Sequence, residues 1–146
     1  MFTNDRTKMR RVFTEAWRKH QENQPMEQME QVIANIIQQH PEYHKLMQDP
    51  DDALDKDFLP EGGQTNPFLH LSMHIALQEQ ISTNRPTGIA GLYQQITQQT
   101  GDPHETEHQL MECLGQMLWE AQRENRMPDE QAYLRSIRAL THTKKR

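Results

Sequence analysis

Apolar residues recur every three or four positions along most of this chain, which is the spacing of one face of an α-helix. Two of these stretches have sharply marked starts, because Asn66 precedes Pro67 and Asp102 precedes Pro103. Asn and Asp are preferred helix N-caps, and Pro is favoured as the first helical residue. No segment shows the two-residue alternation of a half-buried strand. The sequence therefore predicts an all-α fold, an irregular helical bundle of five to six helices.

The length of 146 residues suits one domain, so we expect a single helical domain over residues 1–146. Residues 49–65 are rich in Asp, Pro and Gly and are expected to form a long loop. Residues 143–146 are expected to form a frayed C-terminal tail. The expected helices cover about residues 4–21, 25–39, 67–82, 88–99, 103–124 and 128–142, with a short helical turn over 41–48.

The apolar stripes of two helices predict much of the core. The stripe of the first helix consists of Met9, Val12, Phe13, Ala16 and Trp17. The buried side of the helix over 103–124 is expected to include Leu110, Met111, Leu114, Met117, Leu118 and Ala121.

Apolar residues make up only 34% of the chain and the mean hydropathy is -1.01, so the hydrophobic core is expected to be small for a chain of this length. A bound metal ion would therefore matter more to folding than in a domain with a large core.

Composition also excludes several classes of protein. No apolar run approaches the roughly 20 residues that a membrane helix needs. The first six residues lack an apolar segment after their charges, so we expect no secretion signal. The single cysteine, Cys113, rules out an internal disulfide and suits a reducing compartment. The sequence thus predicts a cytoplasmic protein that does not enter a membrane.

Two helices each carry a His-x-x-x-His pair, His70 with His74 and His104 with His108. Residues four apart share a helix face. The first pair lies in the most apolar helix of the chain, where an imidazole without a hydrogen-bond partner would cost about 1–3 kcal/mol. A metal ion satisfies both rings of a pair at once, since imidazole is the commonest protein ligand for metals.

The two pairs are predicted to share one ion. If each connection reverses the chain direction, the two helices run parallel and the pairs are offset by only about 3 Å along the axis. Four nitrogen ligands suit zinc, copper or nickel, and zinc is the divalent ion that we expect. Whether Glu112, Glu79 or His44 also ligates stays open, as does the alternative that all these histidines are ordinary core or surface residues.

The remaining histidines have simpler explanations. His40 ends a helix, where a cation interacts favourably with the helix dipole. His20 and His142 lie near the ends of expected helices and show no special pattern.

Residues 104–108 also match H-E-x-x-H, the pattern of zinc metalloproteases. In such a site Glu105 would be the general base that activates a zinc-bound water. Acidic residues are, however, favoured in the first turn of any helix by its dipole. A zinc-dependent hydrolase is therefore an alternative function, and whether the protein is an enzyme stays open.

A second alternative follows from charge. Residues 1–20 hold six Lys/Arg against two acidic residues, and residues 125–146 hold the same numbers, whereas the net charge of the whole chain is -5. The basic terminal helices, with Arg10, Arg11, Arg18 and Lys19 in the first of them, could bind an acidic protein or RNA. The protein would then be a non-enzymatic adaptor. An ordinary solvated helix surface explains the same charges.

Several stretches resemble a proteobacterial family of unknown function, domain of unknown function 1841: Asn66–His74, His40–His44, Glu61–Gly63 and Gly101–Leu114. Together they extend over most of the chain. The resemblance implies a short cytoplasmic bacterial protein and assigns no activity, substrate or partner. Members of the family often have Glu where this chain has Gln78, which argues against a carboxylate-bridged two-metal site here.

Overall fold

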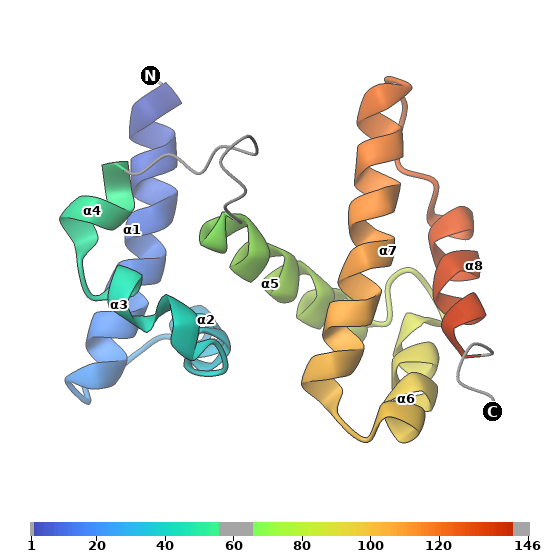
Figure 1. The fold of residues 1–146 in the computed structure, drawn as a ribbon, viewed down its shortest axis with the longest axis horizontal. Coiled ribbons are helices and arrows are strands. Elements are labelled where there is room, and N and C mark those ends of the chain that lie inside the picture. The colour runs from blue at the N-terminus through green and yellow to red at the C-terminus, as the bar shows by residue number, and fades with distance from the viewer. Residues whose placement is uncertain (1, 56–65, 142–146) are drawn as a thin grey trace. The chain divides into compact units, whose positions relative to one another are not determined.

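The computed structural model describes residues 2–55 and 66–141, and in these ranges every regular element is a helix (Figure 1). The expected all-α fold is confirmed. The chain divides into two compact units, Met1–Ile75 (unit 1) and Ala76–Arg146 (unit 2), and the boundary falls inside the helix α5 (Pro67–Thr83). The expected single domain stays a prediction. The expected tail, 143–146, lies outside the described residues.

Unit 1 is built on the long helix α1 (Phe2–Gln21), which packs against α2 (Gln28–Gln38) and α4 (Pro50–Asp55) and also touches α3 (His44–Met47) (Figure 1). The first half of α5 completes the core of this unit. Its elements are α1 (Phe2–Gln21), α2 (Gln28–Gln38), the 3₁₀ helix η1 (Pro41–Tyr43), α3 (His44–Met47), α4 (Pro50–Asp55) and the first half of α5.

The expected loop over 49–65 is wrong for its first part, because Pro50–Asp55 forms α4. Pro50 is the first helical residue, and the Asp49 carbonyl accepts the N–H of Ala53 at 2.9 Å. Helical periodicity does not mark this stretch in the sequence, since a helix of six residues is too short to show a repeated apolar spacing. Residues 56–65 lie outside the described residues. This additional short helix makes the expected count of five to six slightly low.

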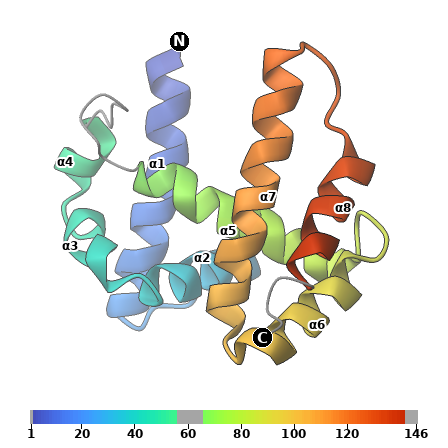
Figure 2. The ribbon, with the colours of Figure 1, turned by 45° about the vertical axis from the view of Figure 1, so that its right-hand side comes forward.

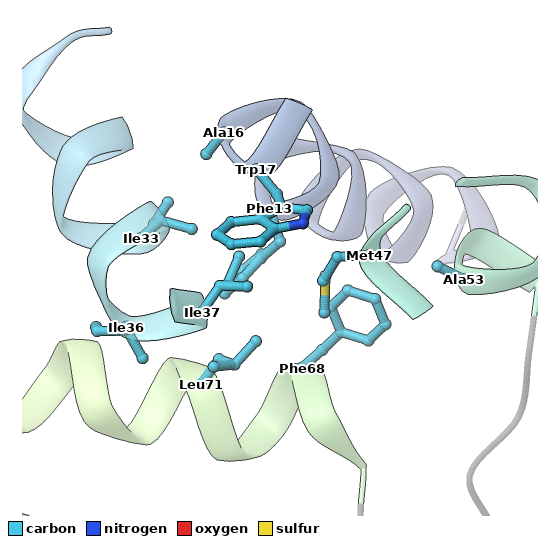
Figure 3. Close-up of a cluster of buried hydrophobic side chains, with 10 residues drawn as sticks. All are labelled: Phe13, Ala16, Trp17, Ile33, Ile36, Ile37, Met47, Ala53, Phe68 and Leu71. Carbon is cyan, nitrogen blue, oxygen red and sulfur yellow. The ribbon is translucent and has the colours of Figure 1, made fainter. Parts of the chain in front are cut away.

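The core of unit 1 joins α1, α2 and α5 through buried aromatic and aliphatic side chains (Figure 3). Ile36 and Ile37, in the last turn of α2, lie beside Leu71 of α5. Two residues of the expected α1 stripe are not part of this core, because Met9 is 46% and Val12 is 48% exposed. The buried set is Phe13, Ala16, Trp17, Ile33, Ile36, Ile37, Met47, Ala53, Phe68 and Leu71.

Arg10 is buried in unit 1 rather than displayed on a basic surface. Its Nη1 donates a hydrogen bond to the Ala53 carbonyl at 2.9 Å, which ties α1 to α4. Its guanidinium also lies 4.8 Å from the centre of the Phe68 ring on α5. A guanidinium packed on an aromatic face and bonded to a carbonyl holds three elements together.

Unit 2 consists of the second half of α5 with α6 (Ile89–Thr100), α7 (Pro103–Arg123) and α8 (Glu130–Leu140). Helices α7 and α8 pack side by side and antiparallel, and α6 contacts both (Figure 2). Leu118, expected in the core, is 42% exposed. The buried apolar residues of this unit are Leu77, Ile89, Leu92, Ile96, Leu110, Met111, Leu114, Ala121, Tyr133, Leu134 and Ile137.

The second half of α5 touches two other helices of unit 2. Gln78 Nε2 donates to Glu107 Oε2 on α7 at 3.3 Å, and the buried Tyr133 hydroxyl on α8 donates to Gln80 Oε1 at 2.7 Å. This part of α5 crosses α7 and does not run parallel to it, contrary to the parallel arrangement assumed from the sequence (Figures 1 and 2).

Among the described residues, every helix is too short or too polar to span a lipid bilayer.

Replacing Arg10 by Ala is expected to lower the free energy of unfolding by about 2 kcal/mol, because a charge-assisted hydrogen bond and buried packing are both lost. Chemical denaturation measured by circular dichroism would show this as a lower midpoint. The matched control is Arg11→Ala, since Arg11 is the exposed neighbour. Equal midpoints for the two variants would contradict the bridging role of Arg10.

Cys113 on α7 provides a second test. Burial raises the pKa of its thiol, and the negative charge of Glu112 raises it further. A thiol with a raised pKa holds less thiolate at neutral pH, and the thiolate is the reactive form. Iodoacetamide should therefore alkylate Cys113 more slowly at pH 7.5 than it alkylates a free cysteine, and the rate should rise at higher pH. A rate in the native protein equal to that of free cysteine would contradict this environment.

Candidate metal centre

His40 stands at the end of α2, directly before Pro41. A residue before proline is disfavoured in the α-helical conformation, and His40 accordingly has φ -125° and ψ 75°. Its ring folds back over the helix end, so that Nδ1 lies 2.8 Å from the Ile36 carbonyl oxygen. A carbonyl can only accept, so Nδ1 carries the hydrogen, and in a neutral ring Nε2 then presents its lone pair. The side chain is 2% exposed.

His70 and His74 lie on the first half of α5, in unit 1. The side chain of Asn66 starts this helix by accepting the N–H groups of Phe68 at 2.9 Å and Leu69 at 3.3 Å, which confirms the expected N-cap. The two histidines therefore share one face, as expected. His74 is fully buried and His70 is half-buried.

Three imidazole rings meet in unit 1. His70 Nε2 lies 3.2 Å from His40 Nε2 and 3.3 Å from His74 Nε2. The three rings are mutually edge-on, with interplanar angles of 81° for His40–His70, 63° for His40–His74 and 70° for His70–His74. The Nε2 atoms of His40 and His74 therefore both lie next to His70 Nε2.

These separations match the geometry of a bound metal ion. Two nitrogens bound to one tetrahedral zinc ion at about 2.0–2.1 Å lie about 3.3–3.4 Å apart. The position of His40 agrees with this use, because metal-binding imidazoles usually donate their second N–H to a carbonyl or a carboxylate. The donors of these three residues are imidazole nitrogens, which favour zinc, copper or nickel over magnesium or calcium.

The second histidine pair lies at the start of α7, in unit 2. Gly101 ends α6 in a left-handed conformation, with φ 73°, and the side chain of Asp102 then caps α7 by accepting the N–H of His104 at 3.0 Å. The His104 and His108 rings face one another edge-on with their centres 4.3 Å apart. One ring nitrogen of His104 and one of His108 lie within 4.8 Å of each other.

Within unit 1, His40 and His74 each have a ring nitrogen that could serve as a metal ligand, and within unit 2 the same holds for His104 and His108. The histidine pairs expected from the sequence thus each form on one helix. That all of His70, His74, His104 and His108 bind one ion stays a prediction.

The carboxylates are arranged differently from the sequence interpretation. Glu79 and Glu112, which were left open as ligands, are exposed. The buried carboxylate is Glu107, 7% exposed, which accepts the hydrogen bond from Gln78. Glu105, the base of the hydrolase alternative, is exposed and accepts a hydrogen bond from Gln109 at 3.2 Å.

His44, also left open as a ligand, has another role. Its Nε2 lies 2.9 Å from the Ile37 carbonyl, to which it donates, and its ring packs on Trp17 with centres 4.5 Å apart. His20 stacks on the same indole at 5.1 Å. His142 lies outside the described residues.

Sequence reasoning missed His40 and Glu107. His40 directly follows a helix and precedes a proline, a pattern that indicated capping and did not reveal which element its ring would meet. Glu107 lies three residues after His104 and one before His108. The H-E-x-x-H motif, however, indicated Glu105 as the functional glutamate. The two glutamates differ in burial, which is known only from the structure.

The basic residues of α1 are largely used within unit 1. Arg18 forms ion pairs at 2.9 Å with both Glu15 and Glu22. Lys19 bonds Glu30 on α2 at 2.9 Å, and this hydrogen bond lowers the pKa of the Glu30 carboxyl. With Arg10 buried, Arg11 is the one residue of the expected four with no ion pair or buried contact described. The adaptor alternative gains no support from this helix and stays a prediction.

Comparison with known proteins gives one match. A family model described as Domain of unknown function (DUF1841) matches residues 5–139. No curated protein and no solved structure matches the chain.

Proposed function

Since this chain belongs to the family described as Domain of unknown function (DUF1841), whose description assigns no activity, we propose a function from its own side chains. We infer that the protein binds a divalent transition-metal ion through histidine. The observation that carries this proposal is the approach of His70 Nε2 to His74 Nε2 at 3.3 Å, in a helix that is buried on this face. Two imidazoles one helical turn apart at this distance form one edge of a tetrahedral site.

The second histidine pair supports the same function. His104 and His108 repeat the spacing on another helix whose start is fixed by Asp102 and Pro103. We propose His70, His74, His104 and His108 as ligands, with zinc as the ion. That both pairs bind one ion is proposed from the sequence alone, and the experiment below tests it separately from metal binding itself.

The number of protein ligands decides what a bound ion could do. Four protein ligands would make the site structural, whereas three would leave a coordination position for water and permit chemistry. For the hydrolase alternative the exposed position of Glu105 gives no support. No observation favours the adaptor alternative either, so metal binding is the one function that we propose.

Metal analysis of untagged protein by plasma mass spectrometry tests this proposal. We expect about one zinc ion per chain in the wild type. His74→Ala should lose the metal, because it removes one of two facing ligands. The control is His20→Ala, which removes a half-buried histidine that stacks on Trp17 and leaves both pairs intact.

His108→Ala separates the two parts of the proposal. Loss of the metal from this variant supports one ion bound by both pairs. Full metal content in His108→Ala, combined with loss in His74→Ala, would show that the second pair is not needed. A wild-type protein that stays free of metal after reconstitution with zinc, copper and nickel would overturn the proposed function.

A further inference from the structure

We infer that His40 binds the same ion as His70 and His74, so that unit 1 contributes three imidazoles to the metal site. The inference rests on the proposed function and deepens it. It places the primary site within one unit, between the end of α2 and the face of α5, and assigns to it a ligand that neither His-x-x-x-His pair contains.

The hydrogen bond between His40 and the end of α2 is the first support. Its Nδ1 donates to the Ile36 carbonyl at 2.8 Å, so the neutral ring directs an Nε2 lone pair toward His70 Nε2 at 3.2 Å. This is the tautomer that a metal ligand requires. A helix-capping role alone would use Nδ1 and would not require a second histidine nitrogen beside Nε2.

The contacts of His70 agree with a shared ion. Its Nε2 lies 3.2 Å from His40 Nε2 and 3.3 Å from His74 Nε2. A hydrogen bond between two ring nitrogens uses one N–H and one lone pair, so a single N–H on His70 Nε2 points directly at only one of these neighbours. A cation between the three ring nitrogens would contact all of them through their lone pairs.

The His40 ring is held rigidly in its position. Tyr43 stacks on it with ring centres 5.4 Å apart and an interplanar angle of 11°, and the Tyr43 ring also lies edge-on to His70 at 6.0 Å. The hydrogen bond to the Ile36 carbonyl fixes the rotation of the His40 imidazole, and stacking on Tyr43 fixes the tilt of the ring. A ligand that is already oriented loses little conformational freedom when the ion binds.

The three-nitrogen donor set selects the class of ion. Imidazole suits zinc, copper, nickel and cobalt, whereas magnesium, calcium and manganese prefer oxygen ligands. The contacts that join His40, His70 and His74 run between ring nitrogens, at 3.2 and 3.3 Å. We therefore expect the site to bind zinc, copper, nickel or cobalt more tightly than magnesium, calcium or manganese.

Cobalt(II) provides the test, because it replaces zinc in tetrahedral sites and a thiolate ligand adds a charge-transfer band in the near ultraviolet. We would prepare His40→Cys in a Cys113→Ser background, which removes the native thiol. The parent with Cys113→Ser should bind cobalt without this band, and His40→Cys should show it. A role in helix capping or packing would not produce a cobalt–thiolate band.

His44→Cys in the same background is the matched control. His44 lies four residues further along the chain, is half-buried and bonds a carbonyl of α2, as His40 does, but its ring packs on Trp17. It should bind cobalt like the parent and show no thiolate band. A folded His40→Cys protein that binds cobalt without the band would overturn the inference while leaving the proposed function intact.

If His40→Cys does not fold, as judged by circular dichroism, His40→Asn provides the second measurement. Asn keeps an amide N–H for the Ile36 carbonyl and removes the ligand nitrogen. Cobalt affinity should fall by more than about 100-fold, since loss of an outer-shell partner alone costs about 10–100-fold. Affinity within about threefold of the parent would overturn the inference. A parent protein that binds no cobalt would overturn both the inference and the proposed function.

Discussion

The packing of the last turn of α2 against α5 is the contact on which the candidate centre depends. Ile36 and Ile37 are buried beside Leu71, and this apolar contact sets the end of α2 next to the face of α5. His40 follows on α2, while His70 precedes Leu71 and His74 follows it by less than one turn. Burial of aliphatic side chains, each worth about 1.5–3 kcal/mol, therefore brings polar ligands together that would not associate by themselves in water.

Unit 1 holds several polar groups within this apolar core, and the groups are tied to backbone carbonyls. Arg10 donates to Ala53, His40 is bonded to Ile36, and His44 is bonded to Ile37. Such bonds satisfy a buried group and also fix its direction, because a carbonyl has a set position in its helix. In a chain that is only 34% apolar, they provide part of the rigidity that a larger core would supply.

Many elements of the fold were predictable because their causes are local. Asn66 and Asp102 start their helices as expected, and the α5 and α7 histidine pairs follow from helical spacing alone. Other features were not local. Met9 and Val12 lie on an apolar stripe that is wider than the surface covering it, and α4 is too short to show a period. The sequence predicted Arg10 to be a surface charge, but α4 and Phe68 cover it.

The sequence by itself determined the helical class, the helix starts, the two histidine pairs and, through its resemblance, the family. Each of these follows from residues within a few positions of one another, where spacing fixes geometry. Only the tertiary structure decided that His40 meets His70, 30 residues away, and that Glu107 rather than Glu105 is buried. The reason is that helical spacing defines which residues share a face but not which element that face meets. That choice is made by the packing of all side chains together.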